Sequence, residues 1–137
     1  MALYADSDTW EPGMLTMASW YQSENWQGRL FRISQTAGRG RGLKKSVYDW
    51  GVVRCLIPTW EMVKGLRSGG ITQQGFSEMY RHLLEQRRVE VSEWLALLSP
   101  DEDTTLLCHE REGEFCHRRL VADIVALERP DVRINLK

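Results

Sequence analysis

The sequence lacks most features of secreted and membrane proteins. It has only three cysteines in 137 residues, an odd number in a chain long enough to bury a core without disulfide bonds. Few cysteines in such a chain favour reduced thiols and a cytoplasmic location. The first residues do not form a basic and then apolar leader, and no run approaches the roughly 20 apolar residues of a membrane span. We therefore expect a soluble cytoplasmic protein with no membrane contact.

The chain also has little net charge. Its 18 Lys and Arg residues nearly balance 19 Asp and Glu residues, for a formal net charge of -1. A near-neutral total excludes the broad positive field of a general nucleic-acid-binding protein, so an anion would have to be attracted locally. With 42% hydrophobic and 27% charged residues, the composition is that of a globular protein, and we expect residues 1–137 to form a single domain.

Hydrophobic patterning predicts strands that alternate with helices. Four segments have the pattern of strands: 14–21, 28–36, 52–57 and 104–108. Four others have the spacing or the end signals of helices: 59–69, 72–88, 91–98 and 116–127. Cys55 in the third strand, and Trp60 and Trp94 in the helices, are expected in the core. The alternation predicts an α/β fold with a mostly parallel sheet flanked by helices.

Five residues capable of chemistry lie within eleven positions, where the last predicted strand leads into the last helix. They are Cys108, Glu110, Cys116, His117 and Arg118. In open α/β sheets, ligands collect beyond the carboxyl ends of strands and beside the N-termini of helices. We therefore expect these side chains to share one pocket.

Three chemical interpretations of this group remain open. In the first, Cys116 is a helix-terminal thiolate with a lowered pKa, His117 or Glu110 carries the proton, and Arg118 binds an anionic substrate. In the second, Glu110 is the nucleophile or general base, as suits attack at a glycosidic carbon. In the third, Cys108, Cys116 and His117 hold a zinc ion, with Glu110 or His109 as a further ligand. The segment lacks the paired Cys-x2-Cys spacing of familiar structural zinc sites, and Cys108 alone could be a buried small hydrophobe.

A second local feature is a glycine-rich basic segment. It carries Arg39, Arg41, Lys44 and Lys45. Such a segment could bind phosphate or single-stranded nucleic acid, with the nearby Tyr48 and Trp50 stacking on bases.

The residues around the strand-to-helix turn also resemble a known family. Leu106-Leu107-Cys108-x-Glu110 followed by Cys116-His117-Arg118 resembles the signature of DUF488, a family of small proteins of unknown function. The resemblance covers most of the chain, since further segments agree: 17–21, 30–34, 58–61, 70–72, and Phe76 with Tyr80. It implies an α/β fold and a shared site made by Cys108, Glu110, Cys116, His117 and Arg118, but it implies no reaction. Similar proteins often carry Arg-Gly or proline after the second strand, where this chain reads Ser34-Gln35-Thr36-Ala37-Gly38-Arg39, so the resemblance does not extend to this segment as a second half of the pocket. His109 occupies a variable position and ranks below Glu110.

The preferred hypothesis is a small cytoplasmic enzyme that acts on an anionic ligand, with a nucleotide or nucleic acid among the candidates. Glu110 and Cys116 would be the reactive groups, His117 would transfer a proton, and Arg118 would supply charge. The alternative is a non-catalytic module that binds a metal, a nucleic acid or a protein partner.

Overall fold

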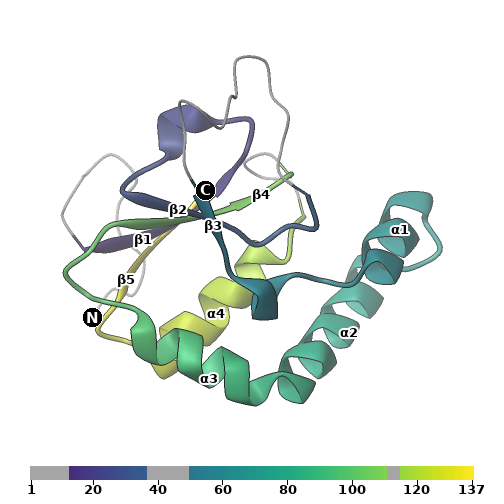
Figure 1. Cartoon of the computed structure of the whole chain (residues 1–137). Helices are drawn as coiled ribbons and strands as arrows, with labels where there is room; N and C mark the ends of the chain where they lie inside the picture. The colour runs from purple at the N-terminus through teal and green to yellow at the C-terminus, as the bar shows by residue number, and fades with distance from the viewer. Residues whose placement is uncertain (1–12, 37–49, 111–114) are drawn as a thin grey trace.

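The computed structural model describes residues 13–36, 50–110 and 115–137 (Figure 1). Within them one sheet contains five strands: β1 (Met14–Ser19), β2 (Arg29–Arg32), β3 (Trp50–Val52), β4 (Thr104–Cys108) and β5 (Arg133–Leu136). Its helices are α1 (Trp60–Ser68), α2 (Gln73–Gln86), α3 (Arg88–Leu97) and α4 (Arg118–Glu128), with short 3-10 turns η1 (Ser23–Asn25) and η2 (Arg54–Leu56). All four strand pairings are parallel, which confirms the predicted α/β fold with a parallel sheet.

The order of the strands creates a crevice at the carboxyl end of the sheet. The order is β3-β2-β4-β1-β5, so β4 lies between β1 and β2, with Ser19 opposite Cys108 and Arg32 opposite Leu107. After β2 the chain continues to β3, at one edge of the sheet, whereas after β4 it continues to β5, at the opposite edge. Such a divergence between neighbouring parallel strands leaves room for a ligand above their carboxyl ends. The residues that follow β2 and β4 border this crevice.

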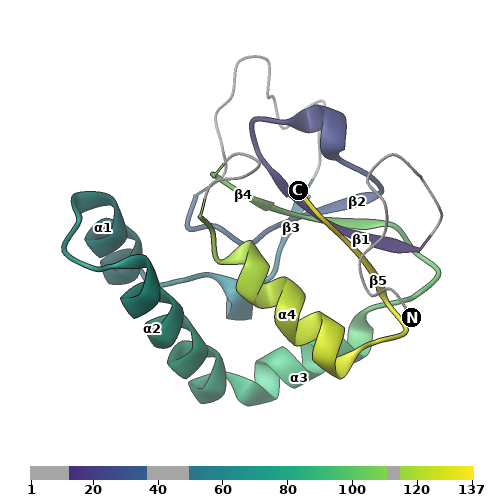
Figure 2. The same cartoon turned by 180° about the vertical axis from the view of Figure 1, so that it is seen from behind.

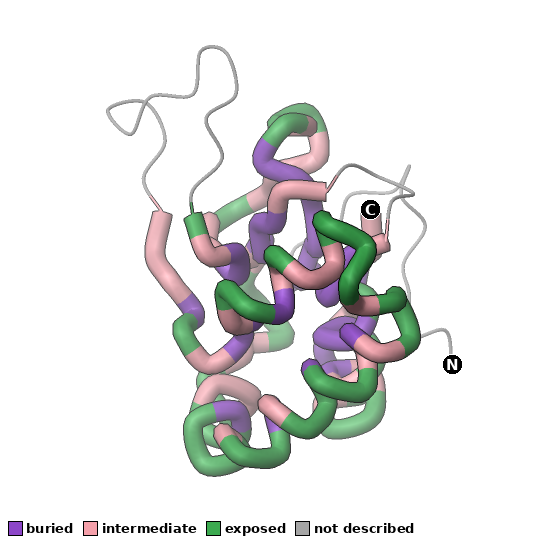
Figure 3. The backbone as a smooth tube through the Cα atoms, turned by 90° about the vertical axis from the view of Figure 1, so that its right-hand side faces the viewer, coloured by how far each residue is buried: buried purple, intermediate pink, exposed green. Residues whose placement is uncertain are grey.

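The two faces of the sheet are covered differently. Figures 1 and 2 show α2, α3 and α4 on the same side of the sheet, and the larger apolar core lies there. The opposite face holds a smaller cluster around Trp20, whose indole packs edge-on against Trp26 and Trp50 at centroid distances of 6.2 and 5.0 Å. Figure 3 shows buried residues along the strands and on the inward turns of the helices, with exposed residues on the outer turns. Burial on both faces accounts for β1, all six of whose residues are buried.

Local capping explains where the first two helices begin and end. The Thr59 side chain accepts the Met62 N–H at 3.2 Å, and the Thr72 side chain accepts the Gly75 N–H at 3.0 Å. Gly69 ends α1 with a φ of 82°, in the left-handed region that glycine tolerates. These caps agree with the helix boundaries expected from the sequence.

Side chains from α2 and its C-terminus hold η2 in place. The buried Tyr80 hydroxyl donates to the Leu56 carbonyl at 2.6 Å, and the Arg87 guanidinium donates to the carbonyls of Cys55 and Ile57 at 3.3 and 2.7 Å. These bonds use backbone oxygens that a strand would have paired with a neighbour. They fix the connection that leads into α1.

Several sequence predictions were wrong in this region and at the C-terminus. The predicted strand 52–57 is replaced by β3, which ends at Val52, followed by η2. Cys55 is consequently half-buried rather than in the core, and Trp60, the first residue of α1, is 45% exposed. Trp94 is partly buried against the core, and β5 was not predicted.

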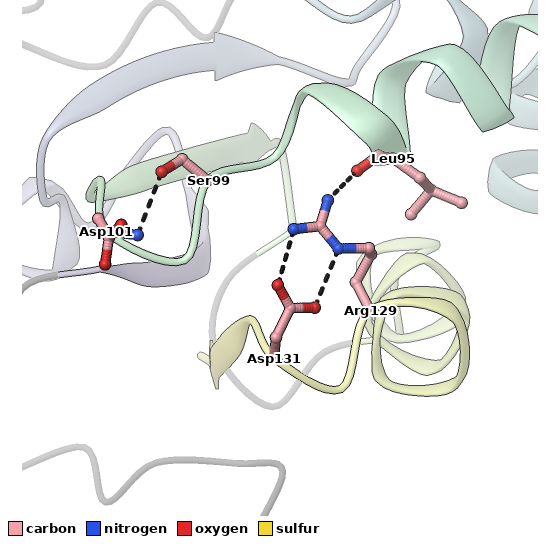
Figure 4. A network of polar contacts seen from close by, with 5 residues as sticks. All are labelled: Leu95, Ser99, Asp101, Arg129 and Asp131. Carbon is pink, nitrogen blue, oxygen red and sulfur yellow. Dashed lines mark hydrogen bonds and ion pairs between the residues drawn. The ribbon is translucent and has the colours of Figure 1, made fainter.

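A polar network joins the end of α4 to α3 (Figure 4). Arg129 pairs with both carboxylate oxygens of Asp131 at 3.0 and 2.8 Å and also donates to the Leu95 carbonyl. This network secures α3 against the connection from α4 to β5. A separate hydrogen bond closes the turn before β4, where the Asp101 N–H donates to the Ser99 hydroxyl at 3.2 Å. None of the helices described is both long enough and apolar enough to cross a membrane.

Candidate functional site

A small cavity of about 40 Å³, partly open to solvent, lies at the crevice between the carboxyl ends of β2 and β4. The Gln35 side chain donates to the Pro58 carbonyl at 2.7 Å and so ties the exit of β2 to the start of α1. The cavity therefore has a mainly polar wall from the sheet side and a mainly apolar wall from the helices. The first consists of Ser34, Gln35, Thr36, His109, Glu110, Cys116 and His117, and the second of Pro58, Trp60, Val63, Leu66, Arg67 and Phe76.

Two free cysteines lie one behind the other at this site. Cys108, the last residue of β4, is fully buried, and Cys116 is 4% exposed and lines the cavity. The Cys116 thiol donates to Cys108 Sγ over 2.8 Å. Cys116 is therefore the sulfur that a molecule in the cavity would meet.

The neighbouring imidazole has a defined tautomer. His117 Nε2 lies 2.7 Å from the Ile33 carbonyl oxygen, which can only accept a hydrogen bond, so Nε2 carries the proton. The unprotonated Nδ1 then faces Cys116 Sγ at 3.5 Å. Burial lowers the pKa of His117 to about 4, although its hydrogen bond to Ile33 acts in the opposite direction. The ring is neutral at neutral pH.

The Cys116 thiol is also neutral at rest. Burial raises its pKa well above the usual value, and the hydrogen bond to Cys108 and the charge of that residue raise it further. The expected lowering of the Cys116 pKa by the helix terminus was wrong, because α4 begins two residues later, at Arg118, and burial outweighs the dipole. The pair rests as thiol and imidazole, not as thiolate and imidazolium.

Arg118 points into the protein rather than into the cavity. It is 3% exposed, and its Nη1 donates to Cys108 Sγ at 3.0 Å and to the Glu110 carbonyl at 2.5 Å. Burial lowers the pKa of Arg118, but its electrostatic interactions with Cys108 and Cys116 and its hydrogen bond to Cys108 outweigh that effect, and the net pKa lies above its usual value. Arg118 thus stays charged and braces β4 against the segment after it, which is not the substrate-binding position expected from the sequence.

Glu110 and the two cysteines form a group that could hold a metal ion. The Glu110 carboxylate, Cys108 Sγ and Cys116 Sγ all lie within 4.8 Å of one another. Two thiolates and a carboxylate are ligands that Zn²⁺ accepts, and three such ligands leave one position open. His117 is not one of the three, although its Nδ1 lies 3.5 Å from Cys116 Sγ. The 2.8 Å between the sulfurs is short for two ligands of one tetrahedral zinc ion, which lie roughly 3.8 Å apart, so the cysteines would have to separate.

His109 lies at the rim and connects the two strands that border the cavity. Its Nε2 is 2.8 Å from the Thr36 carbonyl oxygen and 3.0 Å from the Thr36 hydroxyl. His109 therefore links the segments that follow β2 and β4. Neither this contact nor the helical wall with Trp60 and Arg67 was predicted, because both depend on how α1 and β2 approach the site. The predicted phosphate-binding residues Arg39, Arg41, Lys44 and Lys45 lie outside the described residues.

Comparison with known proteins identifies one match. The sequence matches the family DUF488-N3a, described as "Active DUF488-N3 subclade", over residues 16–129. The matched range runs from β1 to the end of α4 and includes every residue of the site described above. No curated protein and no solved structure matches the chain.

Proposed function

The chain belongs to the DUF488 family, and we propose that it is an enzyme in which Cys116 attacks a small anionic substrate of nucleotide type. The observation that carries the proposal is the position of Cys116. It is the sulfur that lines the cavity, with Glu110 on the same wall and His117 Nδ1 3.5 Å away. The description of the matched family as an active subclade also supports an enzyme.

The resting charges constrain how Cys116 would react. The raised pKa of Cys116 and the lowered pKa of His117 mean that a thiolate is scarce before substrate binds. The sulfur would form its bond to the electrophilic atom while its proton passes to His117 Nδ1 or to the Glu110 carboxylate. The leaving group would then take that proton. Attack by Cys116 therefore depends on transfer of the thiol proton to one of these groups as the sulfur reacts.

The helical wall supports the nature of the substrate. Trp60 lines the cavity and is 45% exposed, so it offers aromatic surface for a flat ring at the mouth of the cavity. Arg67 lies on the same wall and is exposed, so its guanidinium can meet a phosphate at the mouth of the cavity. With Arg118 turned inward, Arg67 takes over the role of binding the anion.

The test is turnover of a panel of nucleotides, followed by mass spectrometry of substrate and product. We expect Cys116→Ser and Glu110→Gln to reduce turnover by about two orders of magnitude or more. Cys55→Ser is the matched control and should keep it, because Cys55 lies on η2, away from the cavity lining. Full turnover in Cys116→Ser would refute the nucleophile. A panel-wide lack of turnover, together with no protection of Cys116 from iodoacetamide by any nucleotide, would refute the substrate class.

A second candidate function is a metal centre, favoured by the cluster of Cys108, Glu110 and Cys116. Elemental analysis of freshly purified, reduced protein would then find about one zinc ion per chain. Cys108→Ser and Glu110→Gln should lower that content, whereas Cys55→Ser should not. Metal-free protein after purification with added zinc would exclude this alternative.

A further inference from the structure

We propose that Cys108 and Cys116 are a redox pair that hydrogen peroxide converts into an intramolecular disulfide bond. This reaction goes beyond the activity proposed above and does not depend on it. It rests on the distance between the two sulfurs, on the different exposure of the two side chains and on the size of the cavity.

The sulfurs are already close enough to bond after a small movement. Cys116 Sγ and Cys108 Sγ are 2.8 Å apart, and a disulfide bond is about 2.05 Å long. Cys108 is held by pairing of β4 with β1 and β2, and its carbonyl accepts the Trp20 N–H at 2.9 Å. Cys116 lies just before α4, outside regular structure, so the approach would be made mainly by its side chain.

The two cysteines differ in their access to an oxidant. Cys116 lines the cavity, whereas Cys108 lies behind it with no exposed surface. The cavity volume of about 40 Å³ admits a molecule as small as hydrogen peroxide. Cys116 is therefore the sulfur that peroxide reaches first, and Cys108 is the resolving cysteine, which lies deeper in the protein.

The reaction balances with peroxide as the only oxidant. Cys116 passes its proton to His117 Nδ1, 3.5 Å away, as its sulfur attacks one peroxide oxygen. The O–O bond breaks, and the departing hydroxide takes that proton and leaves as water. The product is a sulfenic acid on Cys116. Cys108 sulfur then attacks that sulfur, the S–O bond breaks, and the Cys108 proton leaves with the hydroxide as a second water. Two thiols lose two electrons in total, and one peroxide gains them.

The surroundings favour the second step over further oxidation. Arg118 donates to Cys108 Sγ at 3.0 Å and holds this sulfur beside Cys116. Because Cys108 Sγ is already in contact with Cys116 Sγ, it can attack before a second peroxide enters the cavity. The disulfide would also remove the thiol that we propose as the nucleophile, so oxidation would switch the site off reversibly.

The experiment treats the reduced full-length protein with hydrogen peroxide, blocks free thiols and maps peptides by mass spectrometry. We expect peptides containing Cys108 and Cys116 to be linked, with a mass lower by about 2 Da, and to separate on reduction. Cys55→Ser should give the same linkage. In Cys108→Ser the sulfenic acid on Cys116 has no partner and should accumulate, where dimedone can trap it.

Three results would overturn the inference. They are sulfinic or sulfonic acid on Cys116 of the native sequence without a Cys108 linkage, a disulfide that involves Cys55, and unmodified Cys116 at peroxide concentrations that oxidise an exposed thiol. Mapping the unaltered protein needs no variant, so poor folding of Cys108→Ser cannot hide the outcome. The readout is mass and not turnover. The disulfide inference can therefore fail while the proposed activity stands, and the proposed activity can fail while the disulfide inference stands.

Discussion

Replacing His117 with glutamine should remove much of the acid sensitivity of the fold. Burial holds the pKa of His117 at about 4 in the folded protein, against about 6.5 in the unfolded chain. Between these values the unfolded state binds a proton that the folded state does not, so the free energy of unfolding falls as the pH falls. The stability that depends on a neutral His117 is fully present above about pH 6.5 and is lost progressively below it. The loss is complete, and the free energy of unfolding stops changing on this account, below about pH 4.

The size of the effect follows from the difference between the two pKa values. At 1.36 kcal/mol per unit, the shift amounts to about 3 kcal/mol across this pH range. The group is buried, so solvent screening does not reduce the effect much. Glu110, which raises the His117 pKa, and Arg118, which lowers it, are the charged groups acting on the ring. Glutamine has no titrating group, but its amide can still donate to the Ile33 carbonyl.

The assay is urea denaturation, followed by tryptophan fluorescence, at several pH values from about 4 to about 8. The native sequence should lose about 3 kcal/mol more than His117→Gln over this range. His82→Gln is the matched control, since His82 is exposed on α2, and it should behave as the native sequence does. The reasoning would be refuted if the free energy of unfolding changed with pH by the same amount in His117→Gln and in the native sequence. An NMR titration of His117 near pH 6.5 would also refute it.

Two further predictions concern the stability of the scaffold and use the same denaturation assay. Gly28→Ala and Gly69→Ala both force a side chain into a positive φ, of 68° and 82°, but a Cβ at Gly28 would lie 2.1 Å from the Asp103 carbonyl oxygen, whereas Gly69 has open space. Gly69→Ala should therefore cost roughly 1 kcal/mol and Gly28→Ala roughly 3 kcal/mol, and equal costs would contradict the clash. Tyr80→Phe leaves the Leu56 carbonyl without its buried donor and should cost about 1–2 kcal/mol, so an unchanged midpoint would show that this hydrogen bond contributes nothing.

Local signals explain which elements could be predicted from the sequence. Thr59, Thr72 and Gly69 have short-range roles as helix caps, so the boundaries of α1 and α2 follow from the residues themselves. The β-branched Val53 favours extension of β3 beyond Val52, but tertiary hydrogen bonds from Tyr80 and Arg87 hold the chain in η2 instead. The segment that becomes β5 is only four residues long, and it forms a strand mainly because it pairs with β1.

The site shows the same division between local and long-range information. The sequence places Cys108 at the end of a strand and Cys116 before a helix, and the family match agrees with that placement. The direction of Arg118 could not be predicted, because its acceptors lie across the turn on β4 and on Glu110. The pKa of Cys116 could not be predicted either, because it depends on how deeply the whole fold buries the thiol.

The insertion of β4 between β1 and β2 has a consequence for biosynthesis. Among the described strands, β1 pairs with β4 and β5, and β2 pairs with β3 and β4, so the N-terminal strand has no partner among the strands made before Thr104–Cys108. A ribosome releases the apolar β1 segment long before that partner emerges. Assembly of the sheet must await nearly the whole polypeptide, and a product truncated ahead of β4 would leave an aggregation-prone strand exposed. The central strand therefore carries Cys108 and also sets the moment at which the nascent chain can fold.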